Sequence, residues 1–266
     1  MTRILLYFVA SALWAQQGPL DLAFDRLYRH DFSGAHAILK DYTSRNPSDP
    51  VGHSVVSAAH LFSELDRLHI LESEFFGDDD RILSRKKLKP DPGVRAQLFQ
   101  AIGKVRQIAG SGPQDIQALF ALCIATGVQT DYVALVEKRQ MGSLSLAKES
   151  QSWAVRLLKA DPKFYDAYIT TGISEYLLGS VPFFVRWFVK FEQAQGSKTQ
   201  AVRNLELVAA NGRYFRPFAK VLLAIIHLRE KRLPEAERQL RELNQEFPEN
   251  PLFRRELEKV RRRSAN

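Results

Sequence analysis

Residues 35–47, AHAILKDYTSRNP, and residues 236–248, AERQLRELNQEFP, carry the same pattern of side chains 201 residues apart. The shared positions follow intervals of four, three and five residues: Ala35, Leu39, Tyr42 and Pro47, then Ala236, Leu240, Leu243 and Pro248. Apolar side chains at intervals of four and three lie on one face of an α-helix, and a proline ends the helix because it has no N–H to donate. The recurrence predicts two copies of one helical unit.

The composition is that of a globular protein with a basic surface. The chain has 266 residues, of which 45% are apolar and 26% charged, so wholesale disorder is excluded. The formal net charge is +8. That surplus favours acidic partners, anionic membranes or nucleic acid without choosing among them.

The first fifteen residues resemble a secretory signal peptide. Arg3 supplies a positive start, residues 4–13 are apolar, and the small Ala15 precedes the polar pair Gln16 and Gln17. We expect cleavage before Gln16 and a mature bacterial protein in the periplasm or at the outer membrane. The alternative is a buried first helix. Export disfavours nucleic acid as a partner. No stretch after the first fifteen residues is expected to span a membrane.

The rest of the chain reads as helices, with no alternating pattern of strands. Apolar periodicity predicts helices within these ranges: 20–46 as a helix pair, 51–74, 93–109, 113–140, 142–160, 165–179, 198–210, 214–232, 234–246 and 251–263. Two segments break the pattern, at about 76–92 and 180–197, and are interpreted as insertions. Gly172 lies in the middle of its helix, where close packing favours a residue without a side chain.

The repeated unit resembles the second helix of a tetratricopeptide repeat (TPR) hairpin. More narrowly, four segments are similar to uncharacterised secreted or periplasmic bacterial TPR proteins: Asp131–Lys138, Gly179–Phe188, Gly212–Lys220 and Phe247–Phe253. The resemblance implies an all-α solenoid of antiparallel helix hairpins over residues 16–266. It also implies a non-catalytic scaffold that recognises a protein or peptide, with no cofactor. Between residues 50 and 145 the number of repeats stays open.

The intervals between prolines agree with this interpretation. Pro162 and Pro248 are 86 residues apart, which is two repeats of about 34 residues and the length of the second insertion. Pro47 and Pro162 are 115 residues apart, which is three repeats and most of the first insertion.

The second insertion contains the densest aromatic segment. Its five aromatic side chains follow the spacing of one helical face: Phe183, Phe184, Trp187, Phe188 and Phe191. Three interpretations stay open: a core insertion, an anchor in a membrane interface, and an exposed patch for a partner. The membrane anchor would make the chain a peripheral membrane protein.

The concave face of such a stack is the general candidate for partner binding, because stacked hairpins leave a curved surface. The positions expected there are apolar apart from one arginine: Ile169, Ile173, Tyr176, Leu177, Val221, Ile225, Leu228 and Arg229. Either an apolar peptide helix binds there, or the second insertion fills the surface, or these residues are an ordinary packed helix face.

Motifs for catalysis and metal binding are not found. The six histidines form no HExxH pair, and Asp78–Asp80 lacks the alternate spacing of a calcium loop. The single cysteine, Cys123, lies in an apolar run and is interpreted as a buried residue. We therefore expect neither an enzyme nor a metal site. A helical support subunit of an enzyme is the remaining alternative.

Overall fold

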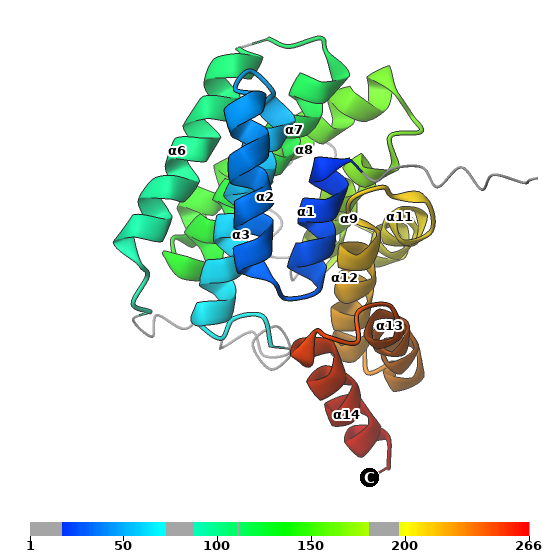
Figure 1. Cartoon of the computed structure of the whole chain (residues 1–266). Helices are drawn as coiled ribbons and strands as arrows, with labels where there is room; N and C mark the ends of the chain where they lie inside the picture. Colours follow the sequence, from blue (N-terminus) through cyan, green and yellow to red (C-terminus); the bar gives the residue numbers. More distant parts are fainter. Residues whose placement is uncertain (1–17, 73–87, 111, 181–196, 266) are drawn as a thin grey trace, which may run out of the picture.

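The computed structural model describes residues 18–72, 88–110, 112–180 and 197–265 (Figure 1). Their regular structure is entirely helical, with no β-strand among the described residues, which confirms the all-α prediction. The helices, with one π-helical turn (η1) and one 3-10 turn (η2), are: α1 (Pro19–Tyr28), α2 (Phe32–Arg45), α3 (Pro50–Arg67), α6 (Pro92–Ala109), α7 (Ile116–Asp131), η1 (Tyr132–Val136), α8 (Gln140–Ala160), η2 (Tyr165–Ala167), α9 (Tyr168–Ser180), α11 (Lys198–Asn211), α12 (Arg216–Arg229), α13 (Leu233–Glu246) and α14 (Pro251–Ala265).

Each helix packs against the next described helix along the chain, from α1 to α14, and α3 also packs against α7. Residues of the repeated pattern lie in the core of the packed helices. Ala35 and Ala236 are fully buried, as is Leu243, and Leu39 is 1% exposed. Gly172 lies against α11, where an added Cβ would come within 3.0 Å of the Leu205 side chain. The packing therefore depends on small side chains where helices approach closely.

Three helix pairs are joined by the same backbone turn. His30, Lys138 and Lys231 have φ values of 66°, 57° and 59°, and the residue after each has ψ of 73°. The turns lie between α1 and α2, between η1 and α8, and between α12 and α13. A left-handed residue of this kind ends a helix and reverses the chain. The local fold thus recurs in the first, middle and last thirds of the chain.

The predicted helix ends before prolines are confirmed at three places. Helices α2, α8 and α13 end just before Pro47, Pro162 and Pro248, respectively, with only one residue between the helix and the proline. Two boundaries differ clearly. The helix expected over residues 51–74 ends at Arg67, and the helix expected over residues 113–140 leaves α-geometry after Asp131 and forms the η1 turn. Of the two expected insertions, residues 76–87 and 181–196 lie outside the described residues.

Helix α1 closes onto the C-terminal part of the chain, which the local sequence pattern did not predict. The Tyr28 hydroxyl donates a 2.8 Å hydrogen bond to the Tyr214 carbonyl, and Arg213 forms an ion pair with Asp21 at 2.8 Å. Asn250 donates a 2.8 Å bond to the Tyr28 carbonyl. Figure 1 shows α1 between α2 and α12. The two ends of the helical array are therefore in contact.

An aromatic cluster fills the space between α1, α3, α7 and α12. Its rings are 4.7–6.4 Å from their neighbours, and we call this set the central aromatic cluster: Phe24, Tyr28, Phe62, Phe120, Phe164, Tyr214, Phe215 and Phe218. Rings at these separations and tilts pack favourably and exclude water. The central aromatic cluster is therefore part of the hydrophobic core.

Asp166 fixes the segment that carries two of these rings. The residue is 4% exposed, and its carboxylate accepts hydrogen bonds from the backbone N–H groups of Arg213, Tyr214 and Phe215 at 2.8–3.2 Å. Burial raises the pKa of Asp166, while the three backbone donors oppose that shift. A short loop is thereby held in position at the start of α12.

Helix α7 and η1 form the most buried segment. Residues 116–136 are long and apolar enough to cross a membrane, so the expectation that no such stretch follows the N-terminus was wrong. Two thirds of that apolar window (67%) is nevertheless buried, and α3, α6 and α8 pack around the helix. Its hydrophobicity is accounted for by its place in the core.

Candidate functional site

The residues expected on the concave face divide into buried and surface positions. On α9, Ile169 and Tyr176 are 6% and 8% exposed and belong to the core with α11 and α12, whereas Leu177 is 56% exposed. Ile173 is partly buried against the same core. The Tyr176 hydroxyl donates a hydrogen bond to Glu230 at 3.4 Å. Only part of the expected face on α9 is therefore accessible.

The four expected positions on α12 are partly buried: Val221, Ile225, Leu228 and Arg229. Val221 packs against the core formed by α13 and α14, and Leu228 packs against a second apolar cluster there. The five aromatic residues of the second insertion, Phe183, Phe184, Trp187, Phe188 and Phe191, lie outside the described residues. The structure thus places five of the eight expected residues in three packed clusters, while Leu177 is exposed and Ile225 and Arg229 are partly buried outside these clusters.

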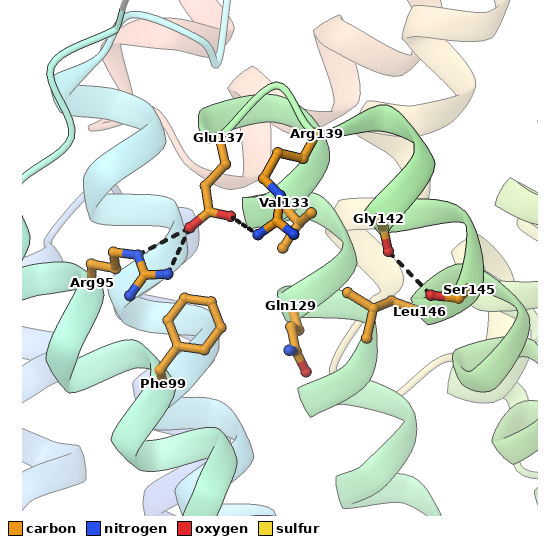
Figure 2. Close-up of a pocket in the computed structure, with 9 residues that line it drawn as sticks. All are labelled: Arg95, Phe99, Gln129, Val133, Glu137, Arg139, Gly142, Ser145 and Leu146. Atoms are coloured by element: carbon orange, nitrogen blue, oxygen red, sulfur yellow. Dashed lines mark hydrogen bonds and ion pairs between the residues drawn. The ribbon is translucent and has the colours of Figure 1, made fainter.

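A pocket that the sequence did not indicate opens between α6, η1 and α8 (Figure 2). Its volume is about 340 Å³ and its lining residues are: Arg95, Phe99, Gln129, Val133, Glu137, Arg139, Gly142, Ser145 and Leu146. We call it the η1 pocket. The Glu137 carboxylate lies between two guanidinium groups, with Arg95 at 2.9 Å and Arg139 at 3.3 Å. Figure 2 shows all three side chains at one rim of the pocket.

The η1 turn explains why these groups meet. The Glu137 N–H bonds to the Tyr132 carbonyl and the Arg139 N–H to the Val133 carbonyl, so the chain widens by one residue and then reverses at Lys138. Single π-helical turns inside α-helices are frequent at functional sites. Here the turn places Glu137 and Arg139 on the same side as α6.

The charges of the η1 pocket do not balance. Two permanently charged guanidiniums share one carboxylate, which leaves one positive charge. The Arg139 and Arg95 side chains are 68% and 49% exposed, whereas Glu137 is 14% exposed. The pocket can therefore accept an anionic group from solvent through the free N–H donors of its arginines.

The apolar side of the pocket is preformed. The Arg95 guanidinium lies 4.6 Å from the centre of the Phe99 ring, and Phe99 packs edge-on against Tyr132 at 5.6 Å. Val133 and Leu146 complete this wall. A ligand with a carboxylate and a short apolar stem matches such a surface. Among the described lining residues there is no histidine or cysteine, and the Ser145 hydroxyl donates to the Gly142 carbonyl.

The other titratable groups lie in packed interfaces. Burial raises the pKa of the Cys123 thiol to about 11, which keeps it protonated at neutral pH. Between α2 and α3, the His36 and His60 rings are 4.5 Å apart, and burial, with the charge of His36, lowers the pKa of His60 to about 4. Within the described part of the chain, no group of three or more His, Cys, Asp or Glu side chains could hold a metal ion.

A second pocket of about 290 Å³ lies between α11 and α12. Three basic side chains line it, Lys198, Arg203 and Arg232, and Lys198 forms an ion pair with Glu230 at 2.7 Å. Glu206 and Glu230 also line it, so, as in the η1 pocket, basic side chains exceed acidic ones by one, beside apolar groups such as Val202 and Ile226.

Comparison with known proteins does not assign the chain to a family. No protein-family model matches it, and no curated protein is significantly similar.

Proposed function

We propose that the chain is a non-catalytic, TPR-like scaffold of the bacterial cell envelope that binds an acidic segment of a protein or peptide in the η1 pocket. The pocket's unbalanced charge is the observation that carries this assignment. An acidic side chain or a chain-terminal carboxylate would replace water around Arg95 and Arg139, and its stem would contact Phe99 and Leu146.

The repeat character is supported by recurring local geometry. The left-handed turn residues His30, Lys138 and Lys231, and the helices that end before Pro47, Pro162 and Pro248, mark three similar hairpins. A stack of such hairpins is rigid because each helix is held by its neighbours. Rigidity reduces the entropy lost on binding and suits a protein that acts by presenting a surface.

No catalytic role is assigned, because the η1 pocket pairs its carboxylate with two arginines and holds its hydroxyl in a backbone hydrogen bond. Placement in the envelope follows from the expected signal peptide in residues 1–15, which lie outside the described residues.

A peptide-display selection on the mature chain tests this function. A random peptide library should yield binders enriched in Asp, Glu or a free C-terminal carboxylate. Substitution Arg139→Gln should weaken those binders by about tenfold, as expected for one charge-assisted hydrogen bond. The matched control is Arg45→Gln, which removes an arginine of similar exposure from α2.

Two results would contradict the assignment. If the selected peptides were not enriched in acidic groups, the proposal that the protein binds an acidic segment would be wrong. Acidic peptides that bind Arg139→Gln as tightly as the unchanged protein would place their site elsewhere.

A further inference from the structure

The positive charge of the chain is concentrated at its C-terminal end. Residues 198–266 contain 16 Lys and Arg against 9 Asp and Glu, a net charge of +7 out of the total of +8. The preceding 197 residues are nearly neutral. An uneven distribution of this kind creates a strong local potential that attracts anionic partners.

Helix α14 presents much of this charge on one face. At 100° per residue, Arg254, Arg255, Glu258, Arg261 and Arg262 lie within an arc of about 120°, and all five are exposed. The opposite arc is held in the core by buried residues: Leu252, Phe253, Glu256, Leu257 and Val260. The arginine face is therefore presented by a helix with a fixed orientation.

Intramolecular ion pairs neutralise this face only in part. Arg261 bonds to Glu237 at 3.1 Å, and Arg255 lies 3.6 Å from Glu72. In the part of the chain that the structure describes, neither Arg254 nor Arg262 forms an ion pair. Helix α14 lies at the end of the array with α13 on one side (Figure 1). Among the described residues, Arg254 and Arg262 are thus available to an anionic surface.

We propose that the α14 arginine face, Arg254, Arg255, Arg261 and Arg262, docks the protein on an anionic phospholipid bilayer. The exposed arc has no aromatic or aliphatic side chain, unlike the anchors on which protein interfaces usually depend. It also has no ring on which a nucleic-acid base can stack. Lipid headgroups move laterally and can match any spacing of arginines, so a bilayer requires no preformed pocket.

The strength of such docking follows from the number of charges. Each basic residue close to an anionic bilayer strengthens binding about fivefold at low salt. Because the attraction is screened beyond about 10 Å at 0.1 M salt, raising the salt concentration weakens it strongly. This site is separate from the η1 pocket and does not depend on its function.

Co-sedimentation of the full chain with vesicles provides the test. We expect binding to vesicles of phosphatidylcholine with about 30% phosphatidylglycerol, little binding to phosphatidylcholine alone, and release at about 0.5 M salt. The triple variant Arg254→Gln, Arg261→Gln, Arg262→Gln should bind at least about tenfold more weakly. The matched control, Lys40→Gln, Lys104→Gln, Lys159→Gln, removes three exposed charges elsewhere and should bind like the unchanged protein. Circular dichroism checks that both variants are folded.

Each opposing result overturns the docking surface. Equal binding to the two kinds of vesicle would show that charge is not recognised. An equal loss of vesicle binding in both triple variants would show that only the net charge of the protein matters. Unchanged vesicle binding in the α14 variant would place the membrane contact elsewhere. Binding of duplex DNA, with the same dependence on the three arginines and no vesicle binding, would assign the face to nucleic acid. Arg139→Gln should leave vesicle binding unchanged, which separates this test from that of the η1 pocket.

Discussion

The hydroxyl of Tyr28 and the backbone carbonyl of Tyr214 form a 2.8 Å hydrogen bond across 186 residues of sequence. Tyr28 ends α1, and Tyr214 lies just before α12. The bond therefore joins the first described helix to the segment just before α12, the third helix from the end of the described chain. Both tyrosines belong to the central aromatic cluster. We therefore expect the stability of the two ends to be coupled at this point.

Tyr28→Phe should destabilise the fold by about 1–2 kcal/mol, because it leaves the Tyr214 carbonyl without its donor. Urea unfolding measures the loss, and hydrogen exchange should increase at residues 213–218 as well as in α1. Tyr42→Phe is the control, since its 2.6 Å bond to Asp49 is local. Unchanged exchange at residues 213–218 in Tyr28→Phe would show that the two ends are not coupled by this bond.

Two glycines in helices should respond to alanine in opposite directions. Gly172→Ala should destabilise by about 1–2 kcal/mol, because the new Cβ would press on Leu205 at 3.0 Å. Gly103→Ala in α6 meets nothing within 4 Å and should stabilise by about 0.5–1 kcal/mol through helix propensity. Thermal or urea unfolding of the two variants measures both changes in stability. A stabilising Gly172→Ala would mean that α9 and α11 lie farther apart than described.

Asp131 should make the fold less stable as the pH rises. Burial raises its pKa from 3.8 to about 7, so the folded state holds a proton that the unfolded state releases. Its contribution is fully present below about pH 4 and is lost as the pH rises to about 7. Asp131→Asn should therefore stabilise the protein by about 1–2 kcal/mol at pH 8 and have little effect at pH 4. Equal effects at both pH values would contradict the shifted pKa.

His60 should act in the opposite direction. Its pKa falls from 6.5 to about 4. Between these two pH values the imidazole is protonated in the unfolded state and neutral in the folded state. Its contribution is present above about pH 6.5 and is lost as the pH falls to about 4. His60→Gln should remove about 1–2 kcal/mol of the acid-dependent loss in unfolding free energy. Urea titrations from pH 7 to 4 measure the unfolding free energy of both proteins. If the two free energies changed with pH in parallel, His60 would not contribute to the loss of stability in acid.

Cys123 should be protected from thiol reagents in the folded protein. It is 4% exposed, its Sγ lies 3.1 Å from the Thr170 hydroxyl, and its pKa is raised to about 11. We expect modification at pH 8 to be at least about 100-fold slower than in urea, because reaction requires local opening. Fast modification of the native protein would show that the α7 core is open to solvent.

Local sequence patterns predicted the helices but not how the array closes. The spacing of Ala35, Leu39 and Pro47 is sufficient to place a helix and its end, because helix periodicity and proline act over a few residues. The contact of Tyr28 with Tyr214 has no local signal. It depends on how the intervening helices pack.

The η1 pocket was not predicted either, because it also depends on contacts between residues far apart in the sequence. Arg95 and Glu137 are 42 residues apart and meet only when α6 packs beside α7. The segment Asp131–Lys138 did stand out in the sequence, through its resemblance to TPR proteins, but nothing in it predicted a π-helical turn. The concave face, by contrast, was expected from a general repeat geometry, and Ile169 and Tyr176 are core residues in this chain.

The bond between Tyr28 and Tyr214 also has a consequence for biosynthesis. At a translation rate of about 5–20 residues per second, the ribosome needs about 10–40 seconds to make the chain between the two residues. During that time α1 has only its neighbours α2 and α3 to pack against, and Phe24 lacks the cover of Tyr214 and Phe215. The first helix therefore gains its complete set of contacts only after Tyr214 and Asn250 have been synthesised.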